Sequence, residues 1–179
     1  KEAWGDARLQ DQPHVGDVLQ TETRAGAQIA FNSGSTVNVR PDSVVYIGGS
    51  AEASTAAWRV QSGKVNFSTG DEATEIVTPT LKTTALQNAS GNIDVSAGGE
   101  TGGKIFRGQA EVETSQGQKI TLNENRAVQV DAAGKAGARL ELPPPPVLVA
   151  PAAKARLPFV APPEATANLS WNAVKNGTT

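Results

Sequence analysis

The sequence contains one glycine-rich run, GGETGGK at residues 98–104, that partly resembles a phosphate-binding loop. Backbone N–H groups of such glycines can surround a phosphate when a hydroxyl residue and a helix N-terminus follow the lysine. Ile105 stands where the hydroxyl residue is needed, and an alternating strand pattern follows it. We therefore expect residues 98–103 to form an exposed hairpin loop that has no affinity for nucleotides.

The chain offers few other groups for catalysis or metal binding. Cys and Met are absent, and the single imidazole, His14, follows Pro13 in a predicted turn. A carboxylate pair for glycoside hydrolysis would have to form through space, and ligand sites of this kind are usually lined by aromatic side chains, which are scarce here at 4%. We predict no enzyme activity, no cofactor and no metal site. The scattered acidic candidates are Asp17, Asp42, Asp71, Glu72, Asp94 and Glu100.

Composition also limits the classes of partner. The formal net charge of the 179 residues is −2, so nucleic acid is not an expected partner. The longest apolar stretch, residues 147–160, contains Pro151, Pro158, Lys154 and Arg156, so we expect no membrane span in this segment. Because the sequence does not begin with Met, we expect upstream sequence, and we expect any membrane anchor to lie outside these 179 residues.

The elements that must position these side chains are predicted to be short strands. Between residues 104 and 130, polar and apolar positions alternate, as in Ala110 and Val112, and this period of two is typical of a strand with one buried face. Gly117 and residues 123–125 interrupt the pattern, so each strand has about five residues. The first 140 residues lack a convincing helical period, and we expect almost no helix.

One short pattern occurs twice in the predicted β unit. Residues 63–67 (GKVNF) and 108–112 (GQAEV) each begin with glycine and then alternate polar and apolar residues. We interpret the unit as two related halves of a short solenoid or roll. Trp58, Tyr46 and Phe106 are expected to be core or cap residues. The predicted core is Ile29, Phe31, Val37, Val39, Val65, Phe67, Val112, Ile120, Leu122 and Val128.

Residues 14–132 carry, in order, a set of short motifs that resembles the FecR domain family, an extracytoplasmic module first known from iron-responsive anti-sigma regulators. The resemblance implies a right-handed β-solenoid-like fold. One family motif, Gly-Thr-x-Phe-x-Val, is replaced here by GNIDV at residues 91–95. The matching residues are Gly16-Asp17 before a strand ending in Thr21, Ser33-Gly34-Ser35 before Val37, Val39, Pro41 and Ser43, Gly63 with Val65, Thr78-Pro79, and Gly108, Val112, Leu122 and Val130.

The composition changes at residues 143–146, which are four consecutive prolines. Such a segment favours polyproline II and acts as a semi-rigid spacer. We predict a lead-in over residues 1–13, a FecR-like β domain over 14–140, a Pro-rich linker over 141–165, and over 166–179 the beginning of a second β-sandwich-like domain that resembles an immunoglobulin-like or fibronectin III-like strand. The linker is expected to pack along its own β unit or a neighbouring subunit. The candidate interaction residues are Val147, Leu148, Val149, Leu157, Phe159, Val160 and Trp171.

The sequence is compatible with three functions. The leading hypothesis is a non-catalytic, extracytoplasmic scaffold or protein-interaction module in the bacterial periplasm or at the cell surface. Its partners would be proteins of the cell envelope, including copies of itself in a larger assembly. The alternatives are the periplasmic signal-receiving domain of a FecR-type anti-sigma regulator and a module that binds peptidoglycan or another glycan, with peptidoglycan contact also possible through other domains.

Overall fold

The computed structural model describes residues 4–48, 57–144, 146–152 and 169–172. The chain forms two compact units, Lys1–Glu141 and Leu142–Thr179, and each is described by itself. The described residues contain strands and turns and no helix, as the sequence pattern predicted. The strands are β1 Val18–Thr21, β2 Ala27–Ala30, β3 Thr36–Val39, β4 Ser43–Ile47, β5 Ala57–Ser68, β6 Thr74–Val77, β7 Leu81–Ala85, β8 Ser90–Val95, β9 Thr101–Arg107, β10 Gln109–Thr114, β11 Lys119–Asn123, β12 Arg126–Val130, β13 Leu140–Glu141, β14 Leu148–Ala150 and β15 Ser170–Trp171.

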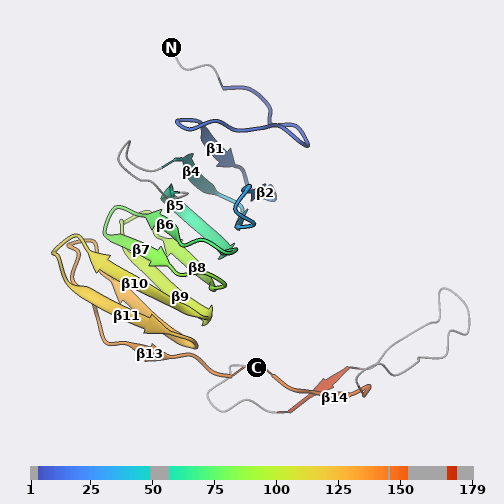
Figure 1. The fold of residues 1–179 in the computed structure, drawn as a ribbon, viewed down its shortest axis with the longest axis vertical. Coiled ribbons are helices and arrows are strands. Elements are labelled where there is room, and N and C mark those ends of the chain that lie inside the picture. Colours follow the sequence, from blue (N-terminus) through green and yellow to red (C-terminus); the bar gives the residue numbers. More distant parts are fainter. Residues whose placement is uncertain (1–3, 49–56, 145, 153–168, 173–179) are drawn as a thin grey trace, which may run out of the picture. The chain divides into compact units, whose positions relative to one another are not determined.

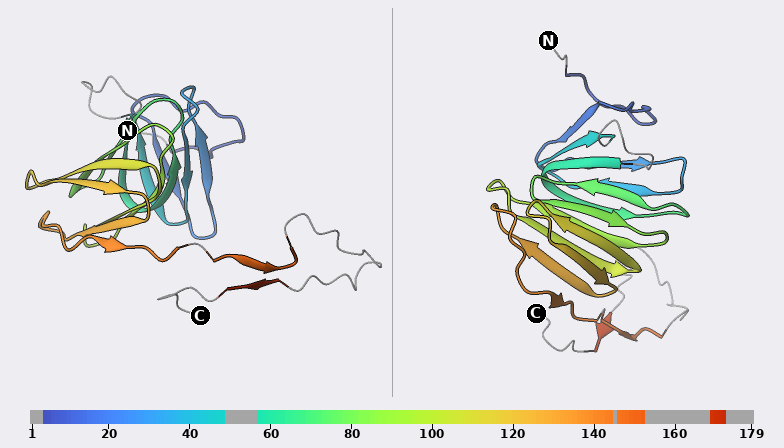
Figure 2. Two further views of the ribbon diagram at one scale, coloured as in Figure 1. Left: turned by 60° about the horizontal axis from the view of Figure 1, so that its bottom comes forward. Right: turned by 60° about the vertical axis from the view of Figure 1, so that its left-hand side comes forward.

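The first unit is one sheet of 13 strands that curls so that its two flanks enclose the core (Figure 1). The long strand β5 belongs to both flanks, because its first half pairs with β4 and β6 and its second half pairs with β3 and β8. One flank is ordered β1-β4-β5-β6-β7-β10-β11 and the other β2-β3-β5-β8-β9-β12-β13. The curl of the sheet is plain in the rotated views of Figure 2. Only the β5–β6 pairing is parallel among the described ladders, so the chain makes a complete turn between these two strands.

The core lies between the flanks and comes from alternate residues of the strands. Nine of the ten predicted core residues are buried, and Phe31 is half-buried against them. Trp58 on one flank packs edge-to-face against Phe67 on the other, with 6.4 Å between ring centroids. Phe106, in contrast, is 48% exposed, which excludes the core alternative of the core-or-cap prediction for this residue. Its neighbour Ile105 is buried, and the period of two therefore turns Phe106 outward.

Glycine occupies the first position of both repeated patterns for the same geometric reason. Gly63 has φ +92° and Gly108 has φ +77°, in the left-handed region that favours glycine. Gly63 also lies against Ser43, at the point where β5 passes from one flank to the other, and an added Cβ there would stand 2.5 Å from the Ser43 Cα. The residues that follow, Val65 and Phe67, enter the core.

Buried hydroxyl groups fill several corners where the chain changes direction. Thr21 donates through Oγ1 to the Arg40 carbonyl at 2.6 Å. Thr101 Oγ1 lies 3.1 Å from Thr78 Oγ1 and accepts a hydrogen bond from Thr80 at 2.8 Å. These side chains form hydrogen bonds with backbone and hydroxyl groups that the strand ladders leave unpaired. The chain can therefore change direction at these corners without burying polar groups that lack a hydrogen-bond partner.

The predicted loop over residues 98–103 is correct only in its first half. Strand β9 begins at Thr101, and Thr101, Gly102 and Gly103 are buried. Gly103 can lie inside a strand because Leu81, Ile93 and Val128 fill the space beside its Cα, 3.6–3.8 Å from where a Cβ would stand. The GNIDV segment at residues 91–95 is likewise part of a strand, β8.

The described part of the second unit is a small antiparallel pair. In it Leu148 of β14 stands opposite Trp171 of β15. The large apolar residues of this pair are exposed to solvent: Val147 63%, Leu148 44%, Val149 54% and Trp171 53%. The immunoglobulin-like strand and the right-handed solenoid predicted from the sequence stay predictions.

Candidate functional site

The side chains considered for catalysis lie apart from one another. His14 is exposed and its Nδ1 is 3.8 Å from Asp17 Oδ2, on the same turn. The described residues contain no cluster of three or more His, Asp or Glu suited to a metal ion. Among the described residues, Lys82 has a pKa that is clearly raised above its ordinary value. The hydrogen bond to Glu75 is the main cause, and the charges of Glu75 and Glu113 raise the pKa further. That lysine belongs to an ion pair on the outside of the sheet, 2.8 Å from Glu75.

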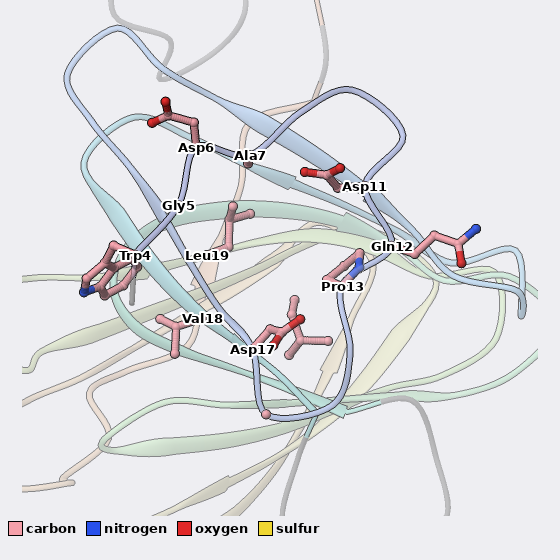
Figure 3. A pocket seen from close by; sticks show the side chains of 12 residues that line it. Trp4, Gly5, Asp6, Ala7, Asp11, Gln12, Pro13, Asp17, Val18 and Leu19 are labelled. Carbon is pink, nitrogen blue, oxygen red and sulfur yellow. The ribbon is translucent and has the colours of Figure 1, made fainter. Parts of the chain in front are cut away.

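A prominent hollow of the described surface lies at the N-terminal end of the first unit. Here residues 4–17 pass over strand β1 and leave a cavity of about 730 Å³ (Figure 3). We call it the N-terminal cavity. From here on we use the name lead-in segment for residues 4–17, which extend beyond the lead-in predicted over residues 1–13. Trp4 and Pro13 line it from the lead-in segment, and Leu19 and Ile47 line it from the sheet. Its volume lies within the range of about 300–1,000 Å³ that is typical of ligand pockets.

Two aspartates hold the lead-in segment in its turns. Asp11 Oδ2 accepts a hydrogen bond from the Arg8 backbone N–H at 2.6 Å, and Asp17 Oδ2 accepts one from the His14 N–H at 2.7 Å. The end of the segment is fixed to the sheet, because Gly16 donates its N–H to the Ile47 carbonyl. The carboxylates are therefore positioned by the same local bonds that shape the loop.

The lining of the N-terminal cavity carries charge of one sign. Asp6, Asp11 and Asp17 line it, and the described part of the chain contributes no Lys, Arg or His to the lining. Apolar side chains of the lead-in segment are unusually exposed at the same time: Trp4 66%, Leu9 95% and Val15 84%. Exposed apolar groups beside polar ones are typical of surfaces that bind a partner.

Strand β1 adds an open sheet edge to this site. It pairs with β4 on one side and with no other described strand. The Ile47 N–H donates to the Asp17 carbonyl, and the register continues as Val18 opposite Tyr46 and Leu19 opposite Val45. In an antiparallel ladder the bonded positions alternate, so the backbone groups of Val18 and Gln20 point away from β4. These groups form the free edge beside the N-terminal cavity.

The sequence-predicted interaction residues belong to the second unit. Val147, Leu148, Val149 and Trp171 are exposed on the β14–β15 pair, while Leu157, Phe159 and Val160 lie outside the described residues. Sequence reasoning missed the N-terminal cavity. The available signal was the spacing of Asp6, Asp11 and Asp17 around Trp4 and Leu9 in a segment without a strand pattern.

The site and fold together define an all-β module whose strongest surface features are a cavity and a free strand edge. No family model and no curated protein matches the chain. Two solved structures have a similar fold, both described as a "putative anti-sigma factor" from Parabacteroides distasonis ATCC 8503 and determined at 1.65 and 2.50 Å. They are 14% and 13% identical to this chain and each has a TM-score of 0.61. The alignment covers 70% of this chain and 60% of each of theirs, and at this identity it shows similarity of fold alone.

None of the described residues belongs to a helix long and apolar enough to cross a bilayer.

Proposed function

We propose that the first unit is a non-catalytic protein-interaction module of the FecR type, with a solenoid-like β fold, in an extracytoplasmic assembly of the bacterial envelope. Two independent observations support this assignment. Short motifs over residues 14–132 resemble those of the FecR family in order, except at residues 91–95, and the solved structures of similar fold are each described as a "putative anti-sigma factor". The exposed apolar residues of the β14–β15 pair would supply a second contact surface in the same assembly.

The N-terminal cavity beside the free edge of β1 is the observation that carries the proposal. An open edge offers backbone donors and acceptors to another chain, and proteins commonly protect such edges or use them for binding. Here the edge is accompanied by a cavity and by Trp4, Leu9 and Val15, all more than half exposed. A module that only connected other domains would gain nothing from leaving these groups uncovered.

Photo-crosslinking in intact cells tests the proposal. A photoreactive amino acid placed at Leu9 or Val15 of the protein in its native host should form a discrete adduct with a protein. The same residue placed at Thr121, which is exposed on β11, is the control. Equal adducts from all three positions, or none from Leu9 and Val15, would refute an interaction site at the N-terminal end.

The second candidate function is the signal-receiving domain of an anti-sigma regulator, favoured by the names of the two solved structures. The identity of the crosslinked partner separates the two. A regulator would crosslink to a protein that delivers the signal, and deletion of the gene would change transcription that depends on a sigma factor. A scaffold would crosslink to structural envelope components, and its deletion would leave that transcription unchanged.

A further inference from the structure

The free edge of β1 is bordered by acidic groups at both of its ends. Asp6, Asp11 and Asp17 line the N-terminal cavity where β1 begins. A second hollow where β1 ends, of about 440 Å³, is lined by Glu22 and Asp42 together with Gln20 and Thr21. Among the described residues, no Lys, Arg or His lines either hollow, although the 179-residue sequence is close to neutral. Acidic groups thus border a strand that spans about 13 Å at 3.3 Å per residue.

Three of these carboxylates are held in place by hydrogen bonds from neutral donors, and Asp17 Oδ2 also lies 3.8 Å from His14 Nδ1. Asp11 and Asp17 each accept a backbone hydrogen bond from their own turn, and Asp42 accepts one from the Thr23 hydroxyl at 2.9 Å. Arg24 directly follows Thr23 and Arg40 stands two residues before Asp42 in the sequence, but neither lines this second hollow. Hydrogen bonds from neutral donors leave the negative charge available to an incoming cation.

These features together match one kind of occupant. We propose that an extended, positively charged peptide segment of a partner protein binds as an added strand on β1, with basic residues at its two ends and apolar side chains toward Trp4, Val18 and Leu19. The backbone groups of Val18 and Gln20 pair with the peptide backbone. The acidic groups at the two ends of the β1 edge favour a peptide with positive charge. This inference rests on the proposed function, because it names the chemistry of the partner at the same site.

Competing explanations for the two features fit less well. An open edge alone would accept any extended chain, whatever its charge. The acidic groups alone would attract any cation and would require no strand. The combination selects a basic peptide that is also able to donate and accept backbone hydrogen bonds.

Peptide titration of the full chain, followed by the NMR amide signals of the ¹⁵N-labelled protein, tests the inference. The probe is the capped peptide Lys-Lys-Val-Thr-Val-Thr-Lys-Lys. It is compared with the same peptide carrying Glu for every Lys, and with one carrying Pro for both Val, which removes two backbone donors. We expect saturable binding of the first peptide only, with shifts at Val18 and Gln20 and slower hydrogen exchange at these amides. Equal binding of the Glu or the Pro peptide, or shifts that spare β1, would overturn the inference.

A double variant, Asp11→Asn with Asp17→Asn, tests the role of charge. The amide keeps an oxygen for the turn hydrogen bonds, so the loop should retain its shape. We expect the affinity for the basic peptide to fall by roughly three- to tenfold at low salt, from two exposed charge contacts. The control is Glu111→Gln with Glu124→Gln. It removes the same charge from two exposed positions, one on β10 and one in the turn between β11 and β12, and should leave the affinity for the peptide unchanged. Equal weakening in both variants would show a general charge effect and overturn the inference.

The two proposals fail separately. Crosslinks from Leu9 and Val15 to a partner protein, with no binding of the basic peptide, would preserve the interaction site and refute the peptide class. Binding of the basic peptide as predicted, without a crosslinked partner in cells, would support the peptide inference and count against the proposed function.

Discussion

Replacement of Gly63, a half-buried residue inside strand β5, by alanine should strongly destabilise the first unit. Two costs coincide at this position. The backbone has φ +92°, which costs a residue with a Cβ about 1–2 kcal/mol. The new Cβ would also stand 2.2 Å from Ser43 Oγ and 2.5 Å from Ser43 Cα, so backbone must move, at a cost of about 1–3 kcal/mol. The sum is about 2–5 kcal/mol, a large part of a typical stability of about 5–15 kcal/mol.

Two matched glycines separate these costs. Gly117 has φ +79° but nothing within 4 Å of an added Cβ, so Gly117→Ala should show the backbone cost alone. Gly98 has neither feature, its nearest neighbour being Ser96 Oγ at 3.7 Å, and Gly98→Ala should be close to neutral. Urea unfolding followed by circular dichroism gives the three free energies. If Gly63→Ala cost no more than Gly117→Ala, the close contact between β5 and the Ser43 backbone would be refuted.

Three further predictions concern the core, a corner and the outer surface. Val112→Asp should unfold the first unit, since it places a charge at a position that is 2% exposed, and a soluble variant with native circular dichroism would contradict the core assignment. Thr101→Val should lower the free energy of unfolding by about 1–3 kcal/mol because two buried hydroxyl partners lose their bond; an unchanged urea midpoint would refute the corner network. The raised pKa of Lys82 means that its pairing with Glu75 stabilises the protein below the ordinary value of 10.5 and that this contribution is lost as pH rises through the raised pKa. The difference in melting temperature between the protein and Glu75→Gln should therefore shrink above pH 10.5, and a constant difference would argue against the pair.

Local patterns were sufficient to predict the short strands and most of the core. The alternation in residues 63–67 and 108–112 correctly placed Val65, Phe67 and Val112 inside, because the period of two acts over neighbouring residues. The same reasoning missed the start of β9, since Gly102 and Gly103 have low strand propensity and are accommodated only by the side chains of distant strands.

Features that depend on distant residues could not be predicted in this way. The division of β5 between two flanks and its parallel pairing with β6 depend on contacts across the whole unit. The N-terminal cavity arises because the lead-in segment folds over β1, and its turns are fixed by Asp11 and Asp17, whose side chains also resemble ordinary surface residues in the sequence. Neither the lead-in segment nor β1 carries a sequence pattern that indicates a cavity, because the cavity forms only where the two come together.

Hydrogen–deuterium exchange of the full chain, alone and bound to the partner identified by crosslinking, tests the central claim most directly. If the N-terminal end is the interaction site, the partner should slow exchange at Val18 and Gln20, whose amides face away from β4, and leave the edge strand β11 unchanged. Protection confined to β11 or to the β14–β15 pair, with β1 exchanging as in the free protein, would contradict the account.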